Sequence, residues 1–180
     1  MAIMPAGRRL LVLRHAKSSW AESNIDDWER PLNDRGRRDA PRVGDRLRRL
    51  SLLPDLIITS DAVRAETTAR LAAEAAGYTG RIVVSPALYH ATPDLIIEVL
   101  RTAPDPAAHA IMIVAHNPGL EDLVARLTGE HVALPTAALV NIALPVDEWD
   151  DLDLSTAASM VPPQVRKSFA VTSRPVRSRR

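Results

Sequence analysis

An aliphatic run from Leu10 to Leu13, ending abruptly in Arg14 and His15, most constrains the fold of this chain. Four consecutive aliphatic residues are typical of a strand buried on both faces of a parallel sheet. In an open α/β sheet the carboxyl ends of the strands form the ligand crevice. The run therefore predicts a permanent cation and a titratable imidazole at that edge. An isolated Arg-His pair is more often a surface or capping pair, so the interpretation requires partners from other strands.

The composition indicates one domain with an aliphatic core. The chain has 180 residues, of which 46% are hydrophobic and only 3% aromatic, which suits helices packed on a sheet. The absence of cysteine excludes a disulfide scaffold and a thiolate metal site. No apolar run reaches the length of a membrane span, and no secretory leader precedes the first strand. We therefore expect a cytoplasmic protein with no membrane partner.

The net charge of +1 conceals a basic end. Residues 164–180 carry six basic residues and no acid, so residues 1–163 hold 17 basic and 22 acidic residues. We expect a domain over 1–163 followed by a flexible basic tail over 164–180. Nucleic-acid binding by this tail is an alternative, but a solvated terminus is favoured because the rest of the chain is acidic and carries no nucleic-acid motif.

Strands and helices are expected to alternate along the chain. Strands are predicted at 10–13, 55–59, 81–84, 111–115, 137–144 and 160–161. Helices are predicted from Asp39 to before Pro54, from a cap at Ser60 or Asp61 to Ala76, from Thr92 to Leu100, and from a cap within Asn117-Pro118-Gly119 to Gly129. This order predicts an α/β fold: a mostly parallel central sheet with helices on both faces.

A polar loop from Ser18 to Asn33 follows the first strand and is expected to lie over its tip. Trp20 and Trp28 within it form either a wall for a planar substrate or, as the more ordinary alternative, anchors of the loop to the core.

Polar groups recur at the ends of three predicted strands: Arg14 with His15, Arg64 in the first turn of a helix, and His116. Two arginines and two histidines, without a metal-ligand spacing, indicate an anion site rather than a metal site. A phosphoryl group fits best, because guanidinium groups bind its equatorial oxygens and a neutral imidazole can attack the phosphorus. Neither a metal nor a cofactor is expected.

Four segments carry a resemblance to a known family. They are Arg14 to Trp20, Arg30 to Gly36, Ser60 to Thr68, and His116 to Gly119. In this order they resemble the histidine phosphatase superfamily, and within it the small SixA-type phosphohistidine phosphatases, over roughly residues 9 to 145. The resemblance implies a phosphoglycerate mutase-like fold, with His15 as the phosphorylated nucleophile. It also implies a phosphate pocket of Arg14, Arg64 and His116, with Ser18 and nearby backbone amides as secondary contacts.

Further candidate contacts to substrate are Lys17, Asn117 and His90. The sequence departs from the family pattern at Ala16, Thr67 and Ala115, none of which removes a catalytic group. Where the family often places an acidic proton donor, this chain has Leu88-Tyr89-His90. An ester needs such a donor more than a phosphoramidate does, so the change favours a P–N substrate, with His90 left open as a donor.

The interval between the third and fourth strands is only about 25 residues, which predicts an open pocket. The sequence thus predicts a metal-independent phosphatase that acts through a phosphohistidine intermediate on phosphohistidine of a phosphotransfer or signalling protein. Phosphate, sulfate and vanadate are the expected site ligands. The alternatives are a phosphatase of small esters, such as a sugar phosphate or nucleotide, and a non-catalytic phosphate-binding module.

Overall fold

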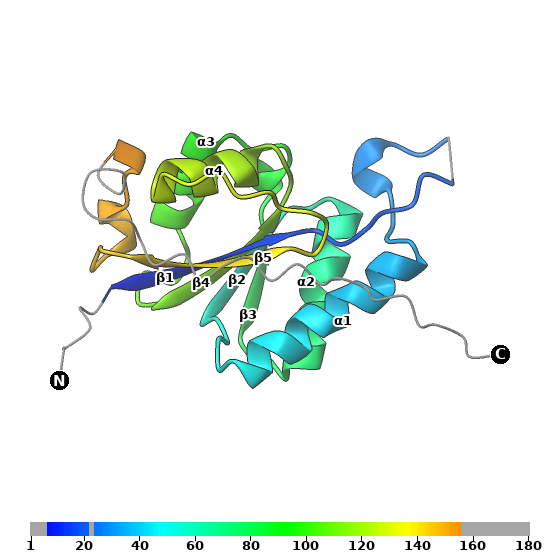
Figure 1. Cartoon of the computed structure of the whole chain (residues 1–180), viewed down its shortest axis with the longest axis horizontal. Coiled ribbons are helices and arrows are strands. Elements are labelled where there is room, and N and C mark those ends of the chain that lie inside the picture. The colour runs from blue at the N-terminus through cyan, green and yellow to red at the C-terminus, as the bar shows by residue number, and fades with distance from the viewer. Residues whose placement is uncertain (1–6, 22–23, 156–180) are drawn as a thin grey trace.

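The computed structural model describes residues 7–21 and 24–155 (Figure 1). Its strands are β1 (Arg8–Arg14), β2 (Leu56–Thr59), β3 (Arg81–Val84), β4 (Ala110–Ala115) and β5 (Leu139–Leu144). Its helices are α1 (Asp34–Arg49), α2 (Val63–Ala76), α3 (Pro93–Arg101) and α4 (Gly119–Thr128). Short 3-10 turns occur at η1 (Asp27–Glu29), η2 (Pro86–Leu88) and η3 (Trp149–Asp151). The strand predicted at 160–161 and the predicted tail at 164–180 lie outside the described residues.

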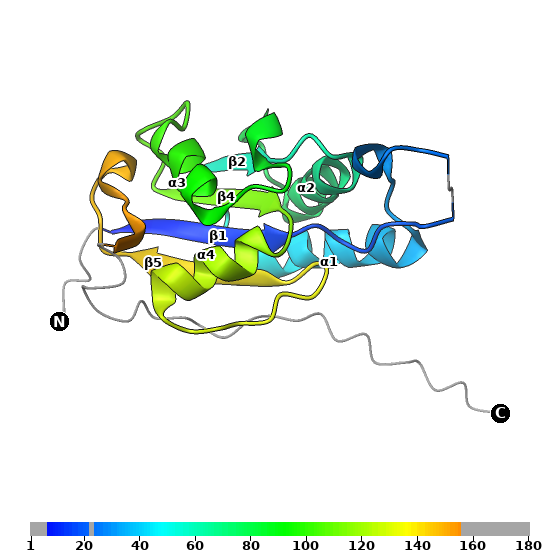
Figure 2. The same ribbon diagram turned by 90° about the horizontal axis from the view of Figure 1, so that it is seen from above.

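The five strands form one sheet in the order β3-β2-β4-β1-β5, and Figure 2 shows β2, β4, β1 and β5 in this sequence. The pairs β3-β2, β2-β4 and β4-β1 are parallel, and only β5 runs antiparallel, against β1. Val114 pairs with Leu13 on one side and with Thr59 on the other, so β1, β2 and β4 end at the same level. The chain after each of these strands therefore starts at one common edge of the sheet.

Helices cover both faces of the sheet, as the alternation of strands and helices predicts. Leu11 and Leu13 of β1 belong to a buried cluster with residues of α1 and α2, whereas Leu10 and Val12 point into a second cluster with α3 and α4. Figure 1 shows α3 and α4 above the sheet and α1 and α2 below it. Among the described residues, no helix has the length and apolar character needed to cross a membrane.

The start of α1 differs from the sequence prediction. The helix begins at Asp34 rather than Asp39, because the Asn33 side chain caps it by accepting a hydrogen bond from the Gly36 N–H at 2.9 Å. Pro41, which the sequence predicts in the first turn of the helix, lies in its interior. The early start places Gly36 against the Lys17 backbone, where a Cβ atom would lie 2.2 Å from the carbonyl oxygen.

The predicted cap of α2 is also wrong, whereas the cap of α4 lies within the predicted segment Asn117-Pro118-Gly119. Ala62 occupies the N-cap position of α2 and Pro118 that of α4, and neither helix has a side-chain cap. The Ser60 hydroxyl instead accepts a hydrogen bond from the Ala62 N–H, and Asn117 donates elsewhere. Thr92, by contrast, caps α3 as predicted.

Candidate functional site

His15 directly follows β1 and is buried. Its Nδ1 lies 2.8 Å from the carbonyl oxygen of Ala16. Because a carbonyl only accepts hydrogen bonds, this contact assigns the ring proton to Nδ1 and leaves the lone pair on Nε2. Burial, opposed by that hydrogen bond and assisted by the charges of nearby arginines, lowers the pKa of His15 to about 4. The ring is therefore neutral at physiological pH, with Nε2 as a nucleophilic atom.

Thr68 of α2 holds the backbone next to His15. Its hydroxyl donates to the Arg64 carbonyl oxygen at 2.6 Å and accepts the Ala16 N–H at 3.0 Å. The peptide after His15 is thus fixed to α2, and Ala16 in turn offers its carbonyl to the His15 ring.

His116 follows β4 and faces His15, with 5.0 Å between the two ring centroids. Its Nε2 lies 2.9 Å from the hydroxyl oxygen of Ser60, which follows β2. Burial and the nearby charges of His15 and Arg64 lower the pKa of His116 to about 3. Two neutral imidazole rings therefore meet at the edge where the parallel strands end.

Three guanidinium groups lie near His15, and the charges of Arg64, Arg14 and Arg30 all contribute to its lowered pKa. Arg64 projects from the first turn of α2, where the helix dipole adds to the positive potential. The terminal nitrogen of Arg14 donates to the Leu134 carbonyl oxygen at 2.7 Å. Such a group of cations is suited to bind an oxyanion.

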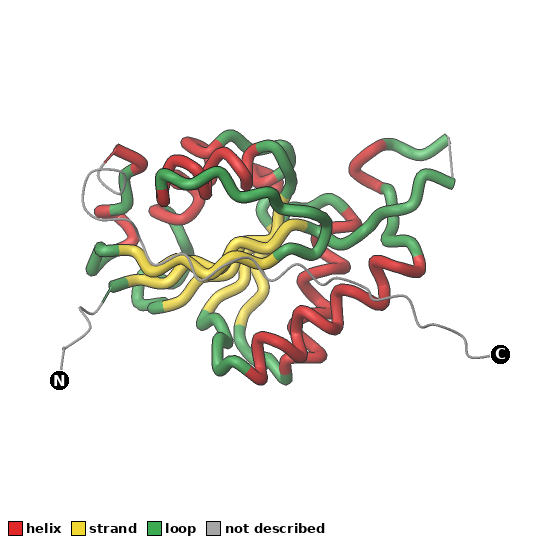
Figure 3. The backbone as a smooth tube through the Cα atoms, in the orientation of Figure 1, coloured by secondary structure: helices red, strands yellow, loops and turns green. Residues whose placement is uncertain are grey.

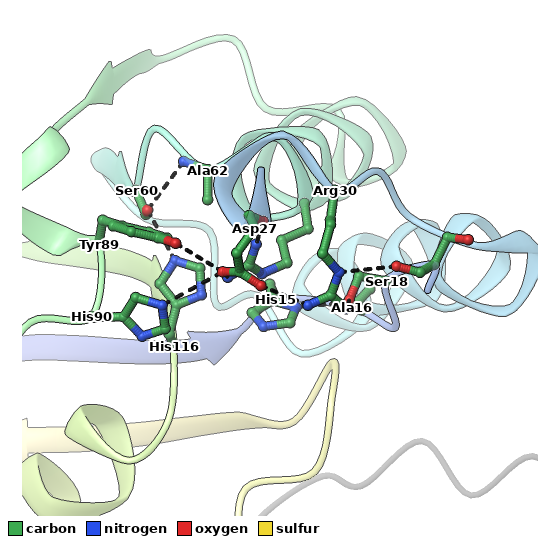
Figure 4. Close-up of polar contacts among 12 residues, drawn as sticks. His15, Ala16, Ser18, Asp27, Arg30, Ser60, Ala62, Tyr89, His90 and His116 are labelled. Carbon is green, nitrogen blue, oxygen red and sulfur yellow. Dashed lines mark hydrogen bonds and ion pairs between the residues drawn. The ribbon is translucent and has the colours of Figure 1, made fainter. Parts of the chain in front are cut away.

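The carboxylate of Asp27 lies between two of these cations, Arg30 and Arg64 (Figure 4). It forms ion pairs with Arg30 at 2.7 Å and with Arg64 at 2.8 Å, and it accepts a hydrogen bond from the Tyr89 hydroxyl at 2.8 Å. His90 Nε2 lies 3.6 Å away. Partial burial alone raises the pKa of Asp27, but the hydrogen bonds from Tyr89, Arg30 and Arg64 outweigh it and hold the pKa well below its usual range.

Of the other predicted contacts to substrate, the structure places some next to His15 and His116 and others away from them. The Ser18 hydroxyl accepts from Arg30 at 2.6 Å, and the His90 ring lies 5.4 Å from that of His116, so both adjoin the site. The Lys17 side chain is exposed. Asn117 donates through its side-chain amide to Glu121 and to the Leu134 carbonyl oxygen, at 2.7 and 3.0 Å. Asn117 therefore ties the segment at Leu134 to α4.

Five residues of the arrangement were not predicted as site residues: Asp27, Arg30, Ser60, Thr68 and Tyr89. Arg30 lies within a segment that carries the family resemblance, and the spacing of Asp27 three residues earlier is a usable signal for an ion pair. Ser60 was interpreted as a helix cap. Nothing in the sequence pattern distinguishes Thr68 from its neighbour Thr67.

The two loop tryptophans do not anchor the loop to the core, because Trp20 is 75% and Trp28 45% exposed. The Arg30 guanidinium instead lies 3.3 Å over the Trp20 ring, a cation–π contact at the rim of the site. Figure 3 shows this loop extending beyond the edge of the sheet. In the described part of the chain, no group of three or more His, Asp or Glu side chains is arranged to hold a metal ion.

Comparisons of the sequence with known proteins identify a matching family and several related sequences. Residues 10–89 match the sequence model of the histidine phosphatase superfamily (branch 1). An uncharacterized chloroplastic protein of Arabidopsis thaliana is 31% identical over 152 residues, which cover 80% of this chain and 70% of that protein. A 2,3-bisphosphoglycerate-dependent phosphoglycerate mutase of Streptomyces avermitilis is 41% identical over 70 residues, only 28% of its length.

Solved structures share the fold. A SixA protein of Agrobacterium tumefaciens has a TM-score of 0.74 at 24% identity, covering 91% of this chain and 98% of its own. The protein histidine phosphatase SixA complexed with tungstate has a TM-score of 0.72 at 19% identity, covering 90% and 96% of the two chains. At these identities the likeness concerns the fold.

Proposed function

The chain belongs to the histidine phosphatase superfamily, and from this membership we propose that it hydrolyses phosphoryl groups through a covalent intermediate on His15. One observation carries the proposal. The His15 ring is fixed with its lone pair on Nε2, it faces His116 at 5.0 Å, and it lies within the field of three guanidinium groups. This combination supplies a nucleophile and the charge that a phosphoryl transition state requires. Because arginine forks supply that charge, the proposed chemistry needs no metal ion.

In the first step, Nε2 of His15 forms a bond to phosphorus while the bond from phosphorus to the leaving group breaks. The electron pair of that bond leaves with the leaving group. Arg14 and Arg64 bind the equatorial oxygens, and a neutral His116 donates a ring N–H. His15 keeps the proton on Nδ1, so the phosphorylated ring is a cation hydrogen-bonded to the Ala16 carbonyl.

In the second step, water attacks phosphorus and the bond to Nε2 breaks. The electron pair returns to Nε2, which regenerates the neutral ring, and orthophosphate leaves after the water proton passes to solvent. The proton retained on Nδ1 makes this step easier, because a protonated imidazole is the better leaving group.

The leaving group we propose is an imidazole, which makes the substrate a phosphohistidine of a phosphotransfer or signalling protein. An imidazole takes its proton from solvent at its second ring nitrogen, whereas an alkoxide needs an acid in the site. The Asp27 carboxylate beside Arg30 and Arg64 is kept ionised by its ion pairs and has no proton to give. Only η2 and α3 lie between β3 and β4, which is consistent with a pocket open to a protein surface.

His90 supports a second candidate, hydrolysis of small phosphate esters such as sugar phosphates or nucleotides. Its ring is 54% exposed and lies beside Tyr89, His116 and Asp27, so a protonated His90 has access to a leaving oxygen. In that case replacement of His90 with glutamine lowers ester turnover and leaves P–N turnover unaffected.

The test is turnover in the presence of a metal chelator. The substrates are a phosphohistidine protein or peptide, p-nitrophenyl phosphate, phosphoserine and a sugar phosphate. We expect phosphohistidine to be lost selectively, with an acid-labile, alkali-stable phosphoenzyme trapped on rapid quenching. His15→Ala should abolish both signals. His109→Ala is the matched control, because His109 is exposed and precedes β4 at the opposite edge of the sheet.

The other possible outcomes distinguish between the proposed function and its alternatives. Equal turnover of all esters keeps His15 as nucleophile and rejects the phosphohistidine assignment. Turnover that persists in His15→Ala rejects the nucleophile. Binding of phosphate without any turnover favours a non-catalytic phosphate-binding module.

A further inference from the structure

Asp27 places a negative charge where the proposed mechanism needs to bind one. One carboxylate oxygen contacts a terminal nitrogen of Arg30 at 2.7 Å, and the other contacts a terminal nitrogen of Arg64 at 2.8 Å. The second terminal nitrogen of Arg64 donates to the backbone carbonyl of the same Asp27. Both terminal nitrogens of the arginine from α2 are thus directed to a single residue of the loop.

The remaining neighbours of this carboxylate are also hydrogen-bond donors. Tyr89 donates its hydroxyl at 2.8 Å, and His90 Nε2 lies 3.6 Å away. Figure 4 shows the carboxylate between the group of Tyr89, His90 and His116 on one side and that of His15 and Arg30 on the other. Two guanidinium groups and a phenol around one anion are donors of the kind that also bind phosphoryl oxygens, and Arg64 is one of the two arginines that the proposed mechanism assigns to those oxygens.

We propose that Asp27 sets the affinity of the site by competing, as a tethered anion, with phosphoryl groups for Arg30 and Arg64. A phosphoryl dianion that approaches the arginines meets a carboxylate already paired with them. Either the carboxylate turns away and gives up its ion pairs, or two anions share the cations; both routes weaken phosphate binding. Protonation of Asp27 does not readily remove this competition, because the contacts of Asp27 favour its charged form.

The consequence concerns which phosphoryl groups are retained, and it rests on the proposed function. A phosphorylated protein makes further contacts outside the pocket, and these offset the loss of the Asp27 ion pairs. Free orthophosphate has no such contacts, so it is held weakly and leaves after hydrolysis. Asp27 thereby lowers the affinity for both ligands by the same factor, so that product is released easily while a substrate with outside contacts still binds.

The structure also offers a contrary role, in which Asp27 holds both guanidinium groups in position and so assists phosphate binding. The two roles predict opposite effects of removing the charge. Asp27→Asn keeps the size and one acceptor oxygen but loses the anion. Asp26→Asn removes the same unit of charge one residue away, from an exposed residue that has no side-chain cap contact in η1.

The test is titration of the full chain and both variants with orthophosphate, followed by calorimetry at fixed ionic strength and pH 7.5. If Asp27 occupies the arginines about nine-tenths of the time, the apparent affinity of the site for orthophosphate is about tenfold lower than that of a free site. We therefore expect Asp27→Asn to bind orthophosphate about tenfold tighter, and Asp26→Asn to change affinity by less than about twofold. Unchanged or weaker binding by Asp27→Asn overturns the proposal. Equal tightening by both variants also overturns it, because it reduces the effect to net charge.

Inhibition by orthophosphate provides the second readout. During turnover of phosphohistidine, product inhibition should become about tenfold stronger in Asp27→Asn, in parallel with binding. The two proposals fail separately. If the chain has no phosphatase activity but Asp27→Asn still binds orthophosphate more tightly, the proposed function is rejected and the competition by Asp27 stands. If the chain is active but Asp27→Asn binds orthophosphate as the parent chain does, the function stands and the competition is rejected.

Discussion

The depressed pKa of His15 sets the pH range in which its Nε2 can act. With a pKa of about 4 the ring is almost entirely neutral at pH 5.5, whereas an imidazole of ordinary pKa 6.5 would be only about one-tenth neutral there. We therefore predict that kcat/KM loses less than about twofold between pH 7 and pH 5.5 through this group. The measurement is the pH profile, together with NMR titration of the histidine ring signals. A tenfold fall with an apparent pKa near 6.5, absent from the His15→Ala titration, would contradict the assignment.

The second prediction at the residue scale concerns Thr68, which acts on the nucleophile through Ala16. Thr68→Val keeps the shape of the side chain but leaves the buried Ala16 N–H without its 3.0 Å acceptor. We expect a loss of about 1–3 kcal/mol in the free energy of unfolding. We also expect about a tenfold fall in kcat with KM nearly unchanged, because the Ala16 carbonyl no longer holds the His15 ring in place.

The control for this variant is Thr67→Val, at a half-buried neighbour on the same helix. It should lower stability less and leave kcat within about twofold. The signal of the His15 Nδ1 proton separates positioning from simple destabilisation, since it should move in Thr68→Val and stay in Thr67→Val. Equal kinetics in the two variants at a temperature where both are folded would remove Thr68 from the positioning role.

At the scale of elements, continuous aliphatic runs made the strands predictable. β1, β2 and β4 coincide closely with runs of Leu, Ile and Val, and Pro93 and Gly129 mark helix ends as expected. The start of α1 was missed because its cap is an isolated Asn33 followed by charged residues, without an apolar stripe. Asp27 was missed because its contact with Arg64 of α2 joins a loop to a helix and leaves no periodic signal, and its spacing from Arg30 alone does not place the pair at the site.

The packing of α1 on α2 depends on Gly44, which gives the third prediction. A Cβ atom there would lie 2.0 Å from the Ala72 carbonyl oxygen and 2.9 Å from the Ala75 Cβ atom, so the two helices must move apart. In a helix, glycine to alanine ordinarily stabilises by about 1 kcal/mol. Here we expect Gly44→Ala to reverse that sign and to lower the unfolding free energy by about 1–3 kcal/mol, measured by urea denaturation. A more stable variant would show that the helices do not pack this closely.

At the scale of the whole molecule, the site exists because three parallel strands end level and separate segments converge on that edge. His15 comes from β1, Ser60 from β2, His116 from β4 and Asp27 from the loop that meets α2. The sequence predicted which strand ends carry polar groups, since strand order in an α/β sheet brings those ends together. It did not predict that a carboxylate lies among the arginines, because that depends on the path of a loop.

The same burial that keeps the imidazoles neutral makes the whole fold sensitive to acid. His15 and His116 have pKa values of about 4 and about 3 when folded, against about 6.5 in an unfolded chain. Below pH 6.5 the unfolded chain therefore binds more protons than the folded one, and the unfolding free energy falls as the pH falls. Asp27, whose folded pKa is also depressed, acts in the same direction at lower pH. Stability from the two histidines is complete above about pH 6.5 and decreases steadily toward pH 4.

We predict that the unfolding free energy falls by roughly 2 kcal/mol or more for each of the two buried histidines between pH 7 and pH 4.5. Urea denaturation at several pH values measures the slope. His15→Asn cannot titrate, so its slope should be shallower by close to one proton in the interval between pH 6 and pH 4.5, whereas His109→Ala, at an exposed position, should leave the slope nearly unchanged. A slope in His15→Asn equal to that of the parent chain would mean that the pKa of His15 is as high in the folded state as in the unfolded one, and the depressed pKa of the nucleophile would have to be abandoned.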